Sequence, residues 1–477
     1  MSQLPSGDTP RTRITTGAVR GTRSGEVDRF LGIPYAKPPF GPRRFALPEA
    51  ADSWSGERDA FDFGPTAPQA PYGPALTNLL QVPVIDGDDI LTVNVWTPTG
   101  AEGAPVVLWL HGGALERGTT AQPGYDGSTF ARDGVVFVSA NHRLGVEGFS
   151  VLDDGPVNLG LLDAALALEW VHREIAAFGG DPTRITLMGE SAGGALVAAL
   201  LSRPQSRSLV SGAIIQSGPL DAQPRTRARR ASDAVARRLG IATTRDAFSA
   251  VAPDRLVATR FEIASGSSPL KGAPGFALTL DEDSLPASPA DALVEVDIPL
   301  LIGTNTDEYR LWLTPEALDG INRLKAWAAR RVMRMPERAF RAAKREFPDA
   351  SPGELLGQLI TDRVLRAPAT LLAKARTAPT FVYEFAWQSP VRGLRAAHAI
   401  EIGFAFDRLD DDDAVRLSGP DAPHALAESM HAAWVSFITT GHPGWPAFGT
   451  ERTTRVWNHP SSTTVPQPRA SVVDALG

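Results

Sequence analysis

The chain has 477 residues, 43% of them hydrophobic, with no cysteine and a net charge of −7. This composition suits a globular protein with a large buried core, and the missing cysteines exclude disulfides, cysteine metal ligands and thiol catalysis. The acidic balance gives no reason to expect nucleic acid or an anionic membrane as a partner.

Apolar, β-branched runs predict buried strands at six places along the chain. They cover residues 105–110, 135–141, 185–188, 213–216, 298–302 and 380–385. A 3.6-residue periodicity predicts helices over 159–178, 192–202 and 425–439. This alternation predicts an α/β fold, in which a large, mostly parallel twisted sheet is flanked by helices. Because no shift in composition divides the chain, we expect one domain over residues 1–477.

Three charged stretches are interpreted as surface. Arginine-rich helices are predicted over 225–238 and 330–345, where arginine is mixed with alanine, valine and other apolar residues. This spacing is more typical of a solvated amphipathic face than of a binding patch. The run Asp410–Asp413 predicts a surface loop, because the glycine and glutamate of a calcium-binding loop are missing.

Residues 1–23 are polar and lack the apolar core of a signal peptide, and no apolar run approaches the length of a membrane span. Neither the HExxH motif of zinc proteases nor a phosphate-binding P-loop occurs. We therefore expect a cytoplasmic protein with no membrane span.

The pentapeptide Gly-Glu-Ser-Ala-Gly at 189–193 lies between the predicted strand 185–188 and the predicted helix 192–202. A serine hydroxyl is a weak nucleophile, so it must stand clear of the chain to meet a base and an electrophile. A sharp strand-to-helix turn exposes the serine, and the flanking glycines avoid collisions that a Cβ would cause. This context predicts that Ser191 is a nucleophile.

A second glycine turn, His111-Gly112-Gly113-Ala114, follows the predicted strand 105–110. Backbone N–H groups of Gly113 and Ala114, together with that of Ala192, are placed to stabilise the oxyanion of a tetrahedral intermediate. An ordinary glycine turn explains the glycines but not their position at the end of a strand.

The base for Ser191 must be one of eight histidines. His398 follows the predicted strand 380–385 and lies on a loop late in the chain. In hydrolases with a nucleophilic serine at such a strand-to-helix turn, the histidine follows the nucleophile and the acid in the chain. Position alone favours it over His424 or His431 only modestly.

The acid that orients this base is expected after a strand between Ser191 and His398. The strand 298–302 is followed by two adjacent carboxylates, Asp307 and Glu308. Either suits the role, and spacing alone does not choose between them.

Several short segments of the chain match a known family pattern. They are FLGIPYA at 30–36, LTVNVWTP at 91–98, NHRLG at 141–145, FGGDP at 178–182, GESAGG at 189–194 and QSG at 216–218. On these segments, and over a similarity that runs from about residue 15 to Trp457, the chain resembles the type-B carboxylesterase and cholinesterase family, and within it the bacterial para-nitrobenzyl esterase-like group. The resemblance implies the α/β-hydrolase fold with helical cap insertions, expected within 221–290 and 311–380.

The family pattern also implies the site. The family acid is the glutamate of a Gly-x-Asn-x-Asp-Glu segment, matched by 303–308, so Glu308 is the expected acid. The family histidine lies in a Gly-x-x-x-x-His-x-x-Glu segment, matched by 393–401, so His398 is the expected base. The oxyanion donors correspond to Gly113, Ala114 and Ala192. Supporting positions around these groups are expected at Gly112, Glu190 and Ser217.

The chain departs from the family pattern in ways that bear on its substrate. Ile90 stands where many relatives have a disulfide cysteine, which favours a bacterial, intracellular protein. Leu115 replaces the usual aromatic residue, and Glu147 stands where an apolar residue is common, both near the expected pocket. No tryptophan segment for a choline site is found, which disfavours cholinesterase activity.

The expected function is hydrolysis of short-chain or aryl carboxylic esters through an acyl-enzyme, with no metal or organic cofactor. The partner is a small-molecule ester, and the protein is expected to be a monomer or weak homo-oligomer. An amidase, lactonase or lipase on the same scaffold is the alternative. A non-catalytic binding protein is disfavoured, because every triad and donor position is filled.

Overall fold

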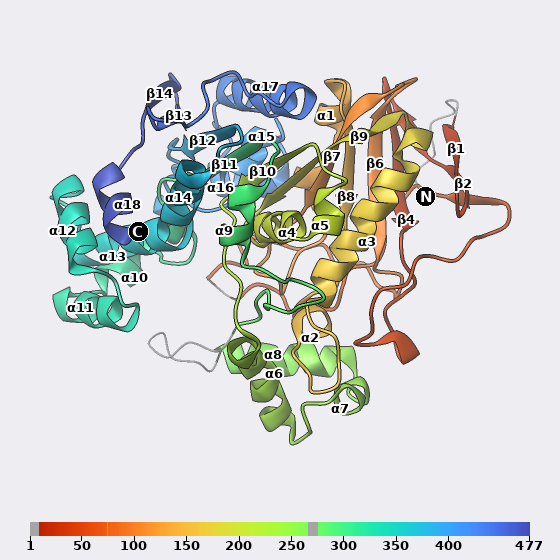
Figure 1. Cartoon of the computed structure of the whole chain (residues 1–477), viewed down its shortest axis with the longest axis horizontal. Coiled ribbons are helices and arrows are strands. Elements are labelled where there is room, and N and C mark those ends of the chain that lie inside the picture. Colours follow the sequence, from red (N-terminus) through yellow and green to blue (C-terminus); the bar gives the residue numbers. More distant parts are fainter. Residues whose placement is uncertain (1–8, 74, 266–274) are drawn as a thin grey trace.

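The computed structural model describes residues 9–73, 75–265 and 275–477 (Figure 1). Its strands are β1 Arg11–Ile14, β2 Gly17–Arg20, β3 Thr22–Ser24, β4 Val27–Pro34, β5 Glu57–Asp59, β6 Thr92–Pro98, β7 Ala104–Leu110, β8 Val136–Ala140, β9 Gly180–Glu190, β10 Gly212–Gln216, β11 Leu300–Asn305, β12 Thr380–Phe385, β13 Thr453–Trp457 and β14 Thr463–Pro466. All six predicted strands are present, with ends shifted by a few residues.

An 11-stranded sheet forms the centre of the molecule, in the order β14-β13-β12-β11-β10-β9-β7-β8-β6-β4-β3. The strands from β13 to β8 in this order are parallel to their neighbours. Antiparallel pairing is confined to the edges, at β14 and at β6, β4 and β3. This is the mostly parallel sheet that the alternating pattern predicts. A separate three-stranded sheet has the order β1-β2-β5.

The α-helices are α1 Ser128–Arg132, α2 Gly145–Phe149, α3 Leu159–Glu174, α4 Ala192–Leu201, α5 Pro204–Arg207, α6 Arg225–Leu239, α7 Arg245–Ser249, α8 Pro253–Ser265, α9 Pro289–Ala292, α10 Pro315–Asp319, α11 Arg323–Val332, α12 Glu337–Glu346, α13 Pro352–Thr361, α14 Ala367–Ala375, α15 Glu401–Ala405, α16 Asp412–Ser418, α17 His424–Thr440 and α18 Ala470–Leu476. Short 3-10 helices are η1 Gly41–Arg43, η2 Pro123–Tyr125, η3 Ile175–Phe178, η4 Leu293–Glu295, η5 Glu308–Leu311 and η7 Val391–Gly393, and η6 Asp362–Arg366 is a π-helical turn.

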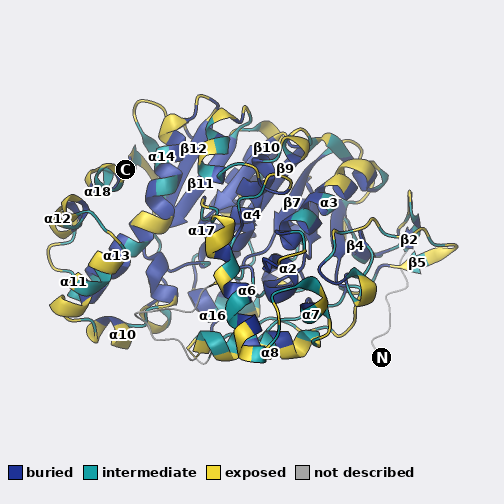
Figure 2. Ribbon diagram, turned by 60° about the horizontal axis from the view of Figure 1, so that its bottom comes forward, coloured by how far each residue is buried: buried dark blue, intermediate teal, exposed yellow. Residues whose placement is uncertain are grey.

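The central strands are buried because helices cover both faces of the sheet. On β7, Val106 and Leu108 join a core cluster with α3 and α4, whereas Val107 and Trp109 join a second cluster with α15 and α17. Successive side chains of a strand point to opposite faces, so one apolar run supplies both cores. Figure 2 shows these strands as the buried interior and the outer helices as the exposed rim.

Two groups of helices project from the sheet in Figure 1, with α6, α7 and α8 at the bottom and α10 to α13 at the left. Helix α13, the last of the second group, begins with a capping box. The backbone N–H of Ser351 donates to the carboxylate of Glu354, and the backbone N–H of Glu354 donates to the hydroxyl of Ser351.

None of the helices in the described ranges combines the length and apolar character needed to cross a membrane.

Two sequence predictions about surface segments are wrong in part. The arginine-rich stretch 330–345 is not one helix, because α11 ends at Val332 and α12 begins at Glu337. Pro336, which has no N–H to continue a helix, and Arg334, at φ 52°, account for the break. The acidic run 410–413 is only half a loop, since Asp412 and Asp413 begin α16.

Candidate active site

Ser191 stands at a sharp turn between β9, which ends at Glu190, and α4, which begins at Ala192. Its backbone has φ 55° and ψ −121°, a strained conformation for a residue with a side chain. The turn packs so tightly that a Cβ on Gly193 would lie 2.0 Å from the carbonyl oxygen of Leu110. The predicted strand, turn and helix are therefore all present at this position.

Five neighbouring strands carry the predicted site residues at their carboxyl ends. Across the sheet, His398 follows β12, Glu308 follows β11, Ser217 follows β10, Ser191 follows β9 and Gly113 follows β7. Parallel strands present their carboxyl ends at one edge of a sheet, which is the usual place for a ligand crevice. Residues up to 285 positions apart in the sequence thus meet because the strand order places them side by side.

Glu308 and His398 form a short hydrogen bond, with 2.6 Å between Oε2 and Nδ1. The other carboxylate oxygen, Oε1, accepts from Ser217 Oγ at 2.6 Å and from the backbone N–H of Asn305 at 2.7 Å. All of these side chains are buried. Three donors therefore fix the carboxylate against the imidazole, which sets the orientation of the ring.

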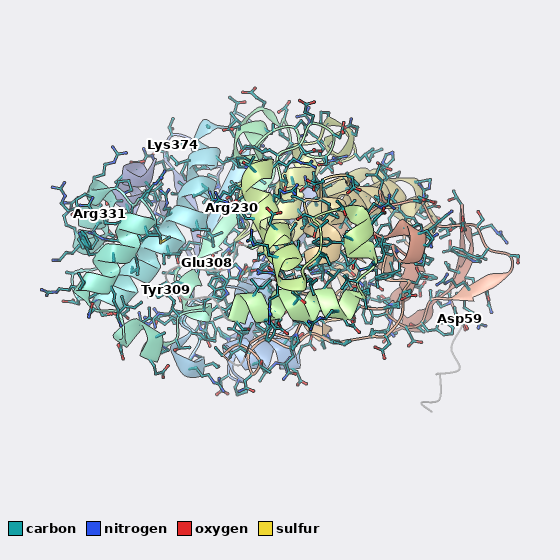
Figure 3. The ribbon with its side chains drawn as sticks, turned by 90° about the horizontal axis from the view of Figure 1, so that it is seen from below. Asp59, Arg230, Glu308, Tyr309, Arg331 and Lys374 are labelled. Atoms are coloured by element: carbon teal, nitrogen blue, oxygen red, sulfur yellow. The ribbon has the colours of Figure 1, made fainter. Side chains whose placement is uncertain are left out.

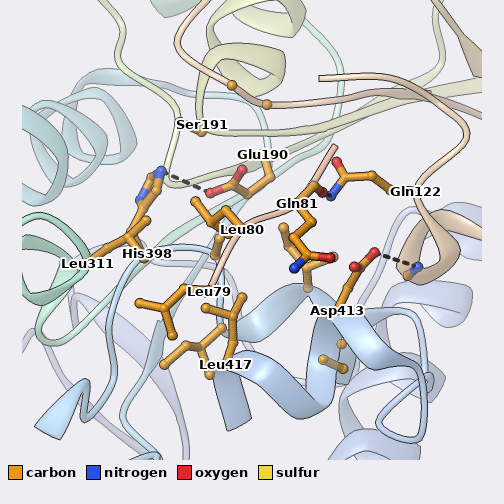
Figure 4. A pocket seen from close by; sticks show the side chains of 18 of the residues that line it. Leu79, Leu80, Gln81, Gln122, Glu190, Ser191, Leu311, His398, Asp413 and Leu417 are labelled. Atoms are coloured by element: carbon orange, nitrogen blue, oxygen red, sulfur yellow. Dashed lines mark hydrogen bonds and ion pairs between the residues drawn. The ribbon is translucent and has the colours of Figure 1, made fainter. Parts of the chain in front are cut away.

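The second ring nitrogen of His398, Nε2, faces Glu190, whose Oε1 lies 3.0 Å away (Figure 4). Among the hydrogen bonds of the described residues, none joins Nε2 to Ser191 Oγ, although both side chains line the same cavity. The sequence placed Glu190 only as a supporting residue, without a partner. The available signal was a carboxylate at the end of the buried stretch 185–190, which closes β9.

The buried carboxylates change the titration of His398. Burial alone would lower the pKa of this imidazole, but the charges of Glu190 and Glu308 outweigh burial and raise it. Burial likewise raises the pKa of Glu190, against the opposing effect of His398. Each of these two shifts depends in part on the charge of the partner, so the protonation of Glu190 and that of His398 are linked.

A third buried carboxylate, Glu401, is the glutamate of the family segment 393–401 but was not predicted as a site residue. Its Oε2 accepts from Asn305 Nδ2 at 2.5 Å, and its Oε1 lies 3.4 Å from Gln216 Nε2. Burial, reinforced by the charge of Glu308, raises the pKa of Glu401 to about 7. The site therefore holds an imidazole among three buried acidic side chains.

The predicted oxyanion donors lie around Ser191. Gly113 and Ala114 have positive φ angles of 117° and 57°, and both line a cavity together with Ser191. Ala192 is the first residue of α4, so its N–H has no partner within that helix. A Cβ on Gly112 would lie 2.6 Å from Glu190 Oε2, so glycine at this position makes room for the carboxylate.

Two cavities meet at Ser191 and His398. The first has leucines on one side and polar side chains from Gln81, Gln122 and Asp413 at its end (Figure 4). The second is mainly apolar and aromatic, and its lining includes Leu115, Phe276, Tyr309, Trp312, Val364 and Leu365. Leu115 is therefore near the pocket, as expected from the sequence.

Other residues considered from the sequence lie elsewhere. Glu147 forms a buried ion pair with Arg44 and is not among the residues that line these two cavities. Asp307 lies 3.8 Å from the guanidinium of Arg310 and not against the histidine. His424 begins α17, and its Nε2 is 3.5 Å from Asp410 at the surface.

The remaining candidate base, His431, is buried in the middle of α17, where its Nδ1 lies 2.8 Å from the carbonyl oxygen of Ala405. Among the residues that the structure describes, no group of three or more histidine, aspartate or glutamate side chains is arranged to hold a metal ion.

Comparisons with known proteins identify the family of the chain. A model of the carboxylesterase family matches residues 8–467. The para-nitrobenzyl esterase of Bacillus subtilis (strain 168) is 35% identical over 461 residues, which cover 92% of this chain and 93% of that protein. The phenmedipham hydrolase of Pseudarthrobacter oxydans is 33% identical over 465 residues, which cover 92% of this chain and 93% of that protein.

The comparison with solved structures also covers nearly the whole chain. A solved structure of a carboxylesterase from Geobacillus stearothermophilus superposes with a TM-score of 0.86 at 32% identity, covering 98% of this chain and 100% of that one. This confirms the α/β-hydrolase fold and the family that the sequence predicts. The chain therefore belongs to the carboxylesterase family and is a hydrolase of carboxylic esters.

Proposed function

We propose that this ester hydrolase uses Ser191 as its nucleophile, His398 as general base and acid, and Glu308 to orient and stabilise the imidazole. The observation that carries the proposal is the hydrogen-bonded chain from Ser217 through Glu308 to His398, which ends beside the turn that exposes Ser191. Such a chain keeps Nε2 as the ring nitrogen available for proton transfer.

In the proposed reaction, Ser191 Oγ attacks the ester carbonyl carbon while Nε2 of His398 accepts the hydroxyl proton. The carbonyl oxygen becomes an oxyanion, held by the N–H groups of Gly113, Ala114 and Ala192. Cleavage of the C–O bond releases the alcohol, whose oxygen takes the proton from His398. Water then repeats these steps on the acyl-enzyme, which releases the acid and restores Ser191.

Glu190 controls when His398 is able to act as a base. Nε2 must be free of a proton to accept one from Ser191. Because the charge of Glu190 raises the pKa of His398, an ionised Glu190 keeps the proton on the imidazole up to a higher pH. We therefore assign Glu190 a positioning and protonation role rather than contact with the ester carbon.

The substrates we propose are short-chain or aryl esters. The second cavity supports this class, because aromatic and branched aliphatic side chains such as Phe276, Trp312 and Val364 suit a compact apolar group. These residues come from segments within 221–290 and 311–380, so we propose that these two segments form the cap of a single domain that spans residues 1–477.

A panel of para-nitrophenyl esters with increasing acyl length tests this substrate class. We expect the highest kcat/KM for acetate or butyrate and a steady fall for longer chains. One emulsified triglyceride and one anilide complete the panel, and we expect little hydrolysis of either. Maximal activity on the emulsion would indicate a lipase, and efficient cleavage of the anilide would indicate an amidase.

We also propose that the protein is cytoplasmic, bacterial, and a monomer or weak homo-oligomer. The support is the cysteine-free sequence and the full-length similarity to an esterase of Bacillus subtilis. Size-exclusion chromatography with light scattering, together with fractionation of cells that express the natural gene, tests these statements.

A further inference from the structure

The segment from α11 to α12 carries a concentration of positive charge that the overall net charge of −7 hides. Residues 321–346 contain two acidic residues, Glu337 and Glu346. The basic residues of the same segment are Arg323, Lys325, Arg330, Arg331, Arg334, Arg338, Arg341, Lys344 and Arg345. In the part of the chain that the structure describes, Arg330 is the one member of this set in an ion pair, with Glu337 at 3.4 Å.

The other arginine-rich helix, α6, is different. There Arg229 pairs with Asp153 and Asp233, and Arg238 pairs with Glu262. Arg225 also lies 3.6 Å from Asp281, so half of the six arginines of α6 have an ionic partner within the protein. Most of the positive charge of α11 and α12 is instead open to an external anionic partner.

Helix α11 also exposes large apolar side chains. Leu324, Trp327 and Val332 are 71%, 50% and 69% exposed, whereas Ala326 is the buried residue of this helix. Leu324, Trp327 and Arg331 are spaced three and four residues apart, so they share one side of the helix. The guanidinium of Arg331 lies 5.5 Å from the ring centre of Trp327.

We propose that the α11 surface, formed by Arg323, Leu324, Trp327, Arg331 and Val332, docks on an anionic lipid surface. The apolar side chains would enter the boundary between headgroups and acyl chains, and the arginines would meet the headgroup phosphates. Tryptophan is enriched at this boundary. Nucleic acid would satisfy the charge but would leave Leu324 and Val332 exposed, so a lipid surface explains both properties together.

The position of α11 fits this role. In Figure 3, Arg331 lies at the periphery, whereas Glu308 and Tyr309 of the site lie further inside. Helix α11 packs against α13, whose residue Ile360 lines the apolar cavity. The proposed docking therefore uses the outer side of α11, whereas α13, on which α11 packs, contributes to the wall of the apolar cavity.

Vesicle flotation tests the proposal. Vesicles of phosphatidylcholine alone are compared with vesicles that contain about one third phosphatidylglycerol, at low and at high salt. We expect binding to the anionic vesicles at low salt, at least about tenfold weaker binding to neutral vesicles, and loss of binding at high salt. No binding to anionic vesicles at low salt, or binding to duplex DNA but not to vesicles, would overturn the proposal.

Paired variants separate this surface from general charge. R323E/R331E reverses two charges of the α11 surface, and R227E/R230E makes the same change on the exposed side of α6. We expect the first to weaken vesicle binding at least about tenfold and the second less than about twofold. Equal losses would overturn the proposal. Circular dichroism and thermal melting check that both variants are folded, and neither readout depends on ester hydrolysis.

The absence of cysteine allows a direct measure of insertion. Leu324→Cys and Leu47→Cys each introduce a single cysteine that is then labelled with a polarity-sensitive fluorophore. Both positions are exposed in the unmodified chain, Leu324 by 71% and Leu47 by 58%. We expect a blue shift on anionic vesicles only for the Leu324→Cys protein. No shift at this position, or equal shifts at both, would contradict insertion of α11.

Discussion

Glu190 Oε1 lies 3.0 Å from Nε2 of His398, while Glu308 Oε2 lies 2.6 Å from Nδ1 of the same ring. The histidine is therefore held between two buried carboxylates. In the proposed mechanism, Glu308 stabilises the imidazolium that forms when Ser191 gives up its proton, whereas Glu190 lies against the nitrogen that receives that proton. The charge of Glu190 is therefore expected to affect the pH range in which His398 acts as a base.

Glu190→Gln should move the acidic limb of the pH profile of kcat/KM. This limb reports the loss of the His398 proton in the free enzyme. Because the charge of Glu190 raises the pKa of His398, its removal should lower that pKa and shift the limb to lower pH, by at least about one unit. Glu401→Gln should shift it less, since Glu401 contributes least among the charges that raise this pKa. An unchanged limb, or a shift to higher pH, contradicts this role.

Glu308→Gln should lower kcat by about 10⁴-fold, because an amide neither stabilises the imidazolium nor enforces its tautomer. The matched variant is Asp307→Asn, at the neighbouring residue that the sequence left as an alternative acid. Asp307 faces Arg310 instead of the histidine, so kcat should fall less than about tenfold. Steady-state kinetics on para-nitrophenyl acetate distinguish the two, and the reverse order of effects would make the assignment wrong.

Ser217→Ala should remove one of the two donors to Glu308 Oε1 and leave the contact between Glu308 and His398 in place. A hydrogen bond to a charged group contributes about 1.5–3 kcal/mol, so kcat should fall about 10- to 100-fold. KM should stay nearly constant, because the hydroxyl bonds Glu308 rather than the ester. A rise in KM at constant kcat would show that Ser217 acts through substrate binding instead.

Asp163→Asn should destabilise the fold without touching the site. Asp163 and Arg143 form a buried ion pair at 2.6 Å, and Asp163 also accepts from the backbone N–H of Arg143. Leaving the arginine charge uncompensated should cost about 3–5 kcal/mol in the free energy of unfolding, measured by urea denaturation. Asp410→Asn, where the side chain is 91% exposed, should cost less than about 0.5 kcal/mol. Similar losses in the two variants would refute the importance of the buried pair.

The features that the sequence predicts are those with a local signature. Ser191 stands in a glycine-flanked pentapeptide between a strand and a helix, and Gly113 follows an apolar strand. These patterns reflect constraints within a few residues, so they can be recognised from the sequence alone. Glu308 and His398 needed the family pattern, because a loop carboxylate or histidine has no distinctive local signature.

The features that the sequence does not predict depend on contacts between distant segments. Glu190 meets His398 only because β9 and the loop after β12 end at the same edge of the sheet. Glu401 joins the site through Asn305, from another strand end. The break before α12 is different, because its cause, Pro336, is local to the segment.

Covalent labelling with an organophosphate tests the central claim, that Ser191 is the activated nucleophile, most directly. Intact-mass and peptide analysis should show one phosphoryl group per chain, located on Ser191, with loss of para-nitrophenyl acetate hydrolysis in proportion to labelling. Ser191→Ala should remain folded, take up no label and have no activity above background. Labelling of another residue, or substantial hydrolysis by a pure Ser191→Ala protein, would contradict the account.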